Sequence, residues 1–135
     1  MTPELVLRAV LGILAVYHVG MGVTAFASPR TAARLAGWLY ALDAQETPAL
    51  RYGVRMLGLY ALGLGALLAV ATANPAGNVE IAAVVAGLQL ARAAARLAFR
   101  HELAAAFHVP PRRNALNAAV LVLEAAVIAA MLLLL

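Results

Sequence analysis

The side chains of this sequence best suited to chemistry are polar and ionisable groups set in otherwise apolar segments. Glu124 lies near the middle of an apolar run that extends from Leu121 to Ile128. A carboxylate at the centre of a bilayer costs on the order of 3 kcal/mol or more and is rarely found there without a partner. The side chains that we expect to form a polar network or a ligand site are His18, Arg55, Tyr60, Gln89, Arg92, Arg96 and Glu124.

Helical spacing predicts which of these side chains meet. Gln89, Arg92 and Arg96 stand at positions i, i+3 and i+7, which share one helix face. The segments around Arg55 and Glu124 carry similar polar stripes, and unpaired charge in lipid is costly, so the three stripes are expected to turn inward and meet. The predicted core contact joins Glu124 to Arg92, with Arg55 or Arg96 completing the network. A bidentate contact with a carboxylate suits arginine better than lysine.

The network has two interpretations that the sequence leaves open. Buried ionic pairs often specify helix packing, which makes the network structural. Three arginines facing one carboxylate also leave surplus positive charge, which backbone carbonyls, phospholipid phosphates or an anionic ligand would satisfy. His18 likewise either bonds to a neighbouring helix or titrates near neutral pH.

No established catalytic or metal-binding pattern accompanies these residues. The sequence has no cysteine, and His101-Glu102 followed by His108 does not have the HExxH zinc spacing. It shows no nucleophile–base pair, and no second carboxylate lies at the depth of Glu124. We therefore expect no metal and no catalytic residue. An isomerase that moves protons through His18 and Glu124 is a weaker alternative.

The composition predicts the class of protein that positions these groups. Hydrophobic residues make up 65% of the 135 residues and charged residues 12%, against roughly 45–50% and 25% in soluble domains. The net charge is +4, and all basic residues are arginines that lie beside or inside apolar blocks. This distribution favours contact with anionic lipid headgroups over nucleic acid.

The apolar blocks predict one all-α domain over residues 1–135, an integral membrane four-helix bundle. Each block is close to the ~20 residues that a spanning helix needs, and isolated strands cannot satisfy their backbone in lipid. A short amphipathic helix over residues 29–42, containing Trp38 and Tyr40, is expected to lie in the membrane interface between the first two spans; an irregular loop is the alternative. The predicted spans are residues 5–27, 48–73, 79–99 and 114–135.

The ends of the predicted helices carry recognisable signals. Thr47-Pro48 supplies an N-cap and a first helical residue, Asn78 supplies the next N-cap, and Pro110-Pro111 breaks the chain before the last span. The acidic opening with Glu4 does not fit the basic start of a cleaved signal peptide, so the first helix is expected to be retained.

Arginine distribution predicts the orientation. The loops after the first and third spans carry most of the loop arginines, and the loop between the second and third spans carries none. Both termini are therefore expected outside, with the arginine-bearing loops in the cytoplasm. Those arginines are Arg30, Arg34, Arg100, Arg112 and Arg113.

The pattern resembles the DoxX-like superfamily of small four-helix bacterial membrane proteins, in its branch of unknown function. The similarity rests on the stretch from Arg55 to Gly63, on Arg92 or Arg96 in the third span, and on Leu123-Glu124 in the last. Alanine stands before the third-span arginine where the family pattern would have glycine. The resemblance implies a bacterial inner-membrane location, and some relatives associate with membrane redox complexes or act as quinone-linked subunits.

The expected function is that of a non-catalytic inner-membrane protein that binds a lipid-like or isoprenoid ligand or a membrane protein partner. The expected partners are membrane lipids, a lipid-like small molecule, and a membrane complex or second copies of the chain. No cofactor is expected for such a binding protein. The alternative is a quinone-linked subunit of a membrane redox complex, in which His18, Tyr60 and Glu124 lie beside a quinone headgroup.

Overall fold

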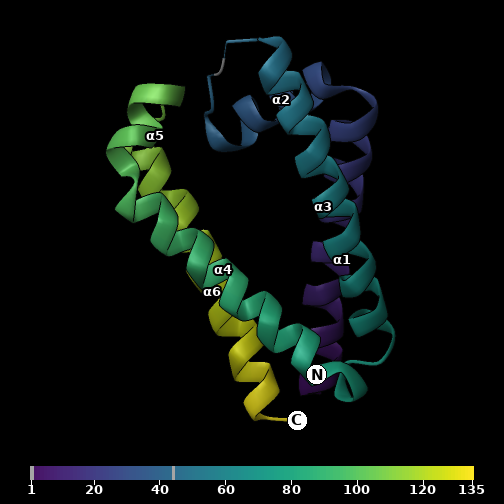
Figure 1. The fold of residues 1–135 in the computed structure, drawn as a ribbon. Coiled ribbons are helices and arrows are strands. Elements are labelled where there is room, and N and C mark those ends of the chain that lie inside the picture. Colours follow the sequence, from purple (N-terminus) through teal and green to yellow (C-terminus); the bar gives the residue numbers. More distant parts are fainter. Residues whose placement is uncertain (1, 44) are drawn as a thin grey trace.

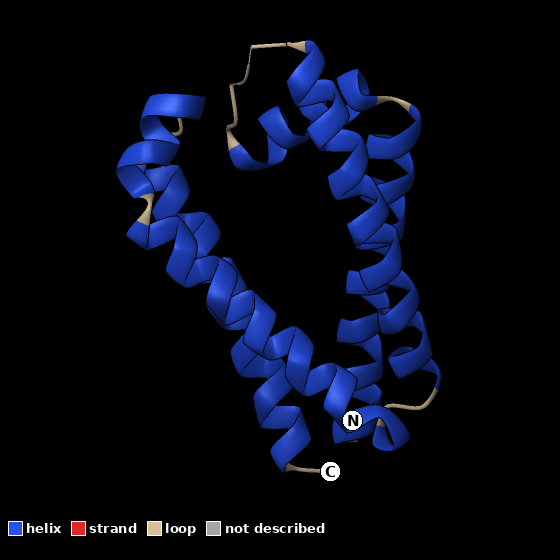
Figure 2. Ribbon diagram, in the orientation of Figure 1, coloured by secondary structure: helices blue, strands red, loops and turns tan. Residues whose placement is uncertain are grey.

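The computed structural model describes residues 2–43 and 45–135, and within these ranges the chain is helical without strands (Figure 2). This confirms the all-α fold class. The elements in order are α1 (Pro3–Ala27), α2 (Pro29–Tyr40), α3 (Pro48–Ala73), the 3₁₀ turn η1 (Ala76–Asn78), α4 (Val79–Ala98), α5 (Arg100–Phe107) and α6 (Pro111–Leu133).

Four helical segments of the described chain are long and apolar enough to cross a membrane, which suggests a multi-pass membrane protein. Their mean hydropathies lie between 1.4 and 2.3. They are Pro3–Ala27, Pro48–Ala73, Ala76–Ala98 and Pro111–Leu133.

Proline and threonine fix where several of these helices begin. Thr47 accepts a hydrogen bond from the Leu50 amide at 3.1 Å, so the predicted N-cap of α3 is confirmed. The last helix begins at Pro111, earlier than the expected residue 114. Proline is well suited to the first helical position because that position needs no backbone N–H donor, so Pro111 starts α6 instead of preceding it.

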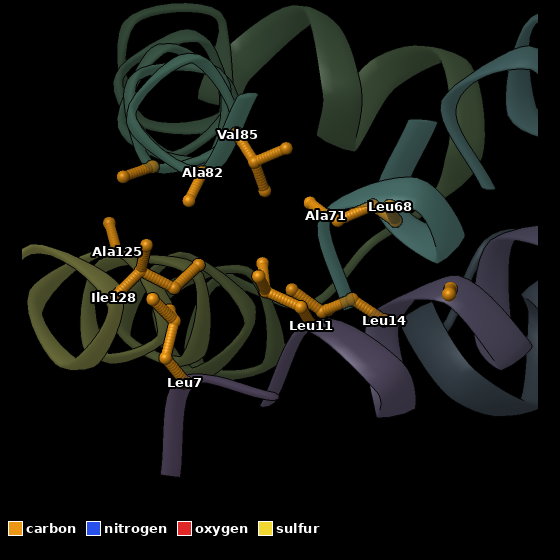
Figure 3. Close-up of a cluster of buried hydrophobic side chains, with 11 residues drawn as sticks. Leu7, Leu11, Leu14, Leu68, Ala71, Ala82, Val85, Ala125 and Ile128 are labelled. Carbon is orange, nitrogen blue, oxygen red and sulfur yellow. The ribbon is translucent and has the colours of Figure 1, made fainter. Parts of the chain in front are cut away.

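The four long helices form two arms that meet at one end of the molecule. α1 packs along α3, and α4 packs along α6. The arms converge at the end that holds both termini and diverge toward α2 and α5 (Figure 1). All four helices contribute to the hydrophobic cluster at the convergence, including Leu11 of α1, Leu68 of α3, Val85 of α4 and Ile128 of α6 (Figure 3). The core therefore holds the arms together at this end.

Glycines bring the backbones of α1 and α3 into close contact. A Cβ atom built on Gly58 would lie 2.9 Å from the Gly22 carbonyl oxygen and 2.9 Å from the Phe26 amide nitrogen. A Cβ on Gly65 would lie 3.0 Å from the Val19 amide nitrogen. Small residues permit this approach between helices, and here they fix which face of α3 packs on α1.

The two short helices lie at the opposite end. The helix predicted near residues 29–42 is confirmed as α2, which ends at Tyr40 with Ala41 in the left-handed region at φ 55°. Helix α5 differs from the sequence-based expectation, which places a loop between the third and fourth spans. Its Ala104–Ala106 run favours helix, but eight residues are too few for a span-length pattern to reveal.

Candidate functional site

The amide of Gln89 connects Glu124 to Arg92. Gln89 is 2% exposed; its Nε2 donates a hydrogen bond to Glu124 Oε2, and its Oε1 accepts one from Arg92 Nη1 at 2.9 Å. Both polar atoms of this buried amide are thereby satisfied, as buried polar groups generally are. Helices α4 and α6 carry the contact, so two of the predicted polar stripes do meet.

The predicted direct contact between Glu124 and Arg92 is wrong. Among the ion pairs within 4.0 Å in the described residues, neither side chain takes part. The register of α4 against α6 explains the difference: Gln89 lies opposite Glu124, and Arg92 lies one turn further along α4 and reaches back to the Gln89 oxygen.

Arg96 contacts α6 at a second position. Its Nε donates to Asn114 Oδ1 at 3.1 Å, and Asn114 Nδ2 donates to the Arg96 carbonyl at 2.8 Å. The guanidinium carbon also lies 5.9 Å from the centre of the Tyr40 ring, within the range of a cation–π contact. Arg96 therefore joins α4 to both α6 and α2, while Arg92 is the arginine linked to Glu124.

Tyr40 joins α2 to both arms. Its hydroxyl shares a hydrogen bond with the hydroxyl of Tyr17 on α1, and its carbonyl accepts from Asn117 Nδ2 of α6 at 3.5 Å. The carbonyls of Trp38 and Leu39 accept from Arg113 Nη2 at 3.4 and 3.3 Å. Carbonyls at a helix C-terminus lack partners within the helix and favour a nearby cation. α6 supplies these partners to α2.

Within the residues that the structure describes, His18 makes no hydrogen bond to a neighbouring helix, so that expected role is also wrong. Its Nδ1 donates to the Leu14 carbonyl on its own helix at 2.8 Å, and the Tyr17 ring meets it edge-on at 5.1 Å. The imidazole is buried. This intrahelical bond satisfies Nδ1 and takes the place of the interhelical contact that we predicted.

The third predicted stripe lies outside this cluster. Arg55 is exposed, and Tyr60 is 77% exposed. α3 packs its Gly58 and Gly65 face against α1, and this rotation leaves Arg55 and Tyr60 on exposed positions.

The structure thus gathers His18, Gln89, Arg92, Arg96 and Glu124 of the candidate set, and adds side chains that the sequence did not single out as a site. The added residues are Tyr17, Tyr40, Arg113, Asn114 and Asn117.

A cavity of about 610 Å³, which we call the α2 cavity, lies between α1, α2 and α3. Ala25 of α1, Ala33 and Gly37 of α2, and Leu57 of α3 are among its apolar residues, and Phe107 reaches it from α5. Its volume falls within the range typical of small-molecule pockets. Its charged lining residues are Arg30, Arg34, Asp43, Glu46 and Arg51.

Ion pairs organise the charged part of the α2 cavity. Glu46 Oε1 lies 2.7 Å from Arg30 Nε and 3.7 Å from Arg51 Nη1. The hydrogen bond from Arg30 holds the pKa of the Glu46 carboxyl below its usual value, with further lowering from Arg51 and Arg34. The same bond raises the pKa of Arg30. One carboxylate therefore contacts guanidinium groups from two different helices.

A smaller cavity of about 330 Å³ lies between α4, α5 and α6, lined by Leu97, Arg100, His101 and Ala104 among others. Within the described parts of the chain, no group of three or more His, Asp or Glu side chains is placed to hold a metal ion. Comparison with known protein families, with curated proteins and with solved structures finds no match to this chain.

The arrangement has two chemically distinct parts. The polar cluster between α4, α6 and the end of α2 satisfies its groups mostly with one another, which suits it to fixing helix positions. The α2 cavity combines a pocket-sized volume with arginines that are exposed or paired at the surface. The α2 cavity is the better candidate for binding a ligand.

Proposed function

We propose that this chain is a non-catalytic, multi-pass protein of the bacterial inner membrane that binds one lipid-like molecule with an anionic head in the α2 cavity. The observation that carries the proposal is the separation of charged and apolar residues within that cavity. We further propose that the chain is a member of the DoxX-like superfamily, on the motifs around Arg55, Arg92 and Glu124.

The α3 residues that line the α2 cavity favour an amphiphilic ligand. Arg51 stands in the first turn of α3, and the lining residues that follow are apolar through Ala61. Ten residues of helix correspond to about 15 Å. A molecule lying along this helix would meet guanidinium groups at one end and aliphatic side chains over the rest of its length. A fully polar ligand would leave the apolar wall unused.

The proposed orientation agrees with such a ligand. With both termini outside, the end that carries α2 and α5 faces the cytoplasm, and the arginines of the α2 cavity lie at the level of the anionic headgroups of the inner leaflet. Juxtamembrane arginines are attracted to these headgroups. A lipid could then enter with its head at the arginines of the cavity and its chain toward Ala61.

The polar cluster serves in this proposal as the structural support of the site. Because Tyr40 joins the end of α2 to Tyr17, Arg96 and Asn117, the cluster holds in place the helix that covers the cavity. The alternatives of a quinone-linked subunit and of an isomerase both require space beside His18 and Glu124. Neither residue lines the two cavities described above, which favours the lipid-binding proposal.

A pair of phenylalanine variants on α3 tests the proposal. Ala61 lines the α2 cavity, and Ala66 lies on an exposed face of the same helix. The full chain is reconstituted in nanodiscs of native lipid, and the retained lipid is measured by native mass spectrometry. We expect wild type and Ala66→Phe to retain one tightly held lipid per chain, and Ala61→Phe to lose it. Equal retention by the two variants, or no retained lipid in wild type, would refute the proposal.

A further inference from the structure

We infer that the carboxylate of Glu46 occupies the headgroup position of the α2 cavity, and that the preferred ligand is a lipid with a phosphate monoester head that displaces it. This inference rests on the proposed function, because it names the ligand class of the same cavity. The observation that carries it is the contact of one carboxylate with arginines from two helices at the charged end of an otherwise apolar cavity.

The geometry of Glu46 is that of an anion held by two guanidinium groups. Oε1 alone makes both contacts, with Arg30 Nε at 2.7 Å and with Arg51 Nη1 at 3.7 Å. Phosphate oxygens are bound by arginine through the same charge-assisted N–H donors. A phosphate placed where this carboxylate lies would therefore meet a donor of α2 at hydrogen-bond distance and a guanidinium of α3 at ion-pair distance.

The contacts of Glu46 are of a kind that a ligand can replace. The side chains of Arg30, Glu46 and Arg51 are 65%, 44% and 46% exposed. Ion pairs in such positions contribute little to stability because water and salt compete for both partners. Displacement of Glu46 into solvent leaves its carboxylate hydrated and releases Arg30 and Arg51 for the ligand.

The charge of the cavity selects the type of head. Its charged lining consists of three arginines and two acidic residues. Once Glu46 is displaced, the three arginines face Asp43 alone, which leaves a net charge of +2. A phosphate monoester carries about −1.5 to −2 near neutral pH, whereas a phosphodiester head carries only −1. The charge of the monoester is closer in magnitude to the +2 of the cavity, which favours a lipid of the phosphatidic acid type over phosphatidylglycerol.

The apolar part of the cavity distinguishes a lipid phosphate from a free one. The residues deeper along α3, including Val54, Leu57 and Ala61, offer no donors to an inorganic anion. The acyl part of a lipid would bury apolar surface there, which contributes roughly 25 cal/mol for each Å² removed from water. Inorganic phosphate is therefore expected to bind much more weakly than the lipid.

The test compares two glutamine variants that remove the same charge. Glu46→Gln abolishes the proposed competitor, and Glu102→Gln removes an exposed carboxylate on α5 that does not line the α2 cavity. The full chain in detergent is titrated with dioctanoyl phosphatidic acid, dioctanoyl phosphatidylglycerol and inorganic phosphate by calorimetry. We expect Glu46→Gln to bind phosphatidic acid about two- to fivefold more tightly than wild type, the change that loss of one exposed ion pair corresponds to. Glu102→Gln should match wild type.

The outcomes separate this inference from the proposed function. If wild type binds phosphatidic acid and the two glutamine variants bind it equally well, Glu46 is no competitor and the inference is refuted while lipid binding stands. Equal binding of phosphatidylglycerol and phosphatidic acid refutes the choice of head, and inorganic phosphate binding as tight as that of the lipid refutes a lipid ligand. Absence of saturable binding of either lipid to wild type refutes the inference and the proposed function together.

An arginine variant provides a test in the opposite direction. Arg30→Gln removes the closer partner of Glu46 and one donor to the proposed phosphate, so its affinity for phosphatidic acid should fall below that of wild type. Far-UV circular dichroism confirms that each variant is folded. An Arg30→Gln protein that is folded and binds phosphatidic acid as wild type does would also refute the inference.

Discussion

The glycine contact between α1 and α3 supports a quantitative prediction. We expect Gly58→Ala to have a lower free energy of unfolding than Gly63→Ala. Both positions lie within α3. The added methyl group at Gly58 would lie 2.9 Å from the Gly22 carbonyl oxygen and 2.9 Å from the Phe26 amide nitrogen. At Gly63 it would meet no other described residue within 4 Å. The Gly58 contacts are with backbone atoms, so no change of side-chain conformation relieves them.

The matched pair isolates the cost of this contact. Replacing glycine by alanine inside a helix gains about 1 kcal/mol from helix propensity, and both variants share this gain. Overpacking at a close contact costs about 1–3 kcal/mol because the helices must shift apart. Gly58→Ala is therefore expected to be about 1–3 kcal/mol less stable than Gly63→Ala, while Gly63→Ala is expected to be about 1 kcal/mol more stable than wild type.

The assay is unfolding by sodium dodecyl sulphate in mixed micelles, followed by far-UV circular dichroism, with the free energy of unfolding compared between variants. Gly65→Ala extends the test, because its Cβ would lie 3.0 Å from the Val19 amide nitrogen and it should behave as Gly58→Ala does. Equal unfolding free energies for Gly58→Ala and Gly63→Ala would show that the backbones of α1 and α3 are not in contact at this point, and the reasoning would fail.

Three further predictions concern the polar groups. Tyr40→Phe should cost about 0.5–1.5 kcal/mol of unfolding free energy through loss of the bond to Tyr17, and an equal loss in Tyr52→Phe, at an exposed position, would contradict this. Gln89→Leu should cost about 1–3 kcal/mol, because Glu124 loses its donor; a variant with the unfolding midpoint of wild type would refute the role of Gln89. Because Arg30 lowers the pKa of Glu46 from its usual 4.5, the ion pair stabilises the fold fully above that pH, and its contribution disappears as pH falls through the lowered folded-state pKa. The difference in unfolding free energy between wild type and Glu46→Gln should therefore shrink on acidification. A difference that grew instead would show that folding does not lower the pKa of Glu46.

The long helices could be predicted from the sequence because the signals that define them are local. Each is an apolar run of span length, and residues such as Thr47 and Pro48 mark a start whatever the rest of the chain does. The arrangement of the helices in two arms depends on contacts such as Gly22 with Gly58. Many glycines occur along the first two spans, and the sequence alone does not say which of them meet.

The candidate site was predictable only in part for the same reason. The spacing of Gln89, Arg92 and Arg96 shows that they share a face, but the residue opposite Glu124 depends on the register of two antiparallel helices. The exposure of Arg55 follows from the rotation of α3, which the packing against α1 determines. The role of Tyr40 had no local signal, because it depends on where the end of a short helix lies relative to two distant segments.

The pairing of α4 with α6 has a consequence for how the protein is made. If the four helices cross a membrane as proposed, α4 alone would carry Gln89 Nε2 and the Arg96 guanidinium into lipid without their α6 partners, and α6 alone would carry Glu124 without its donor. Together they satisfy these groups through the bonds of Gln89 with Glu124 and of Arg96 with Asn114. The arm formed by α4 and α6 is then a helical hairpin that enters the bilayer as one unit. A chain truncated after α4 should therefore be retained by the insertion machinery or degraded.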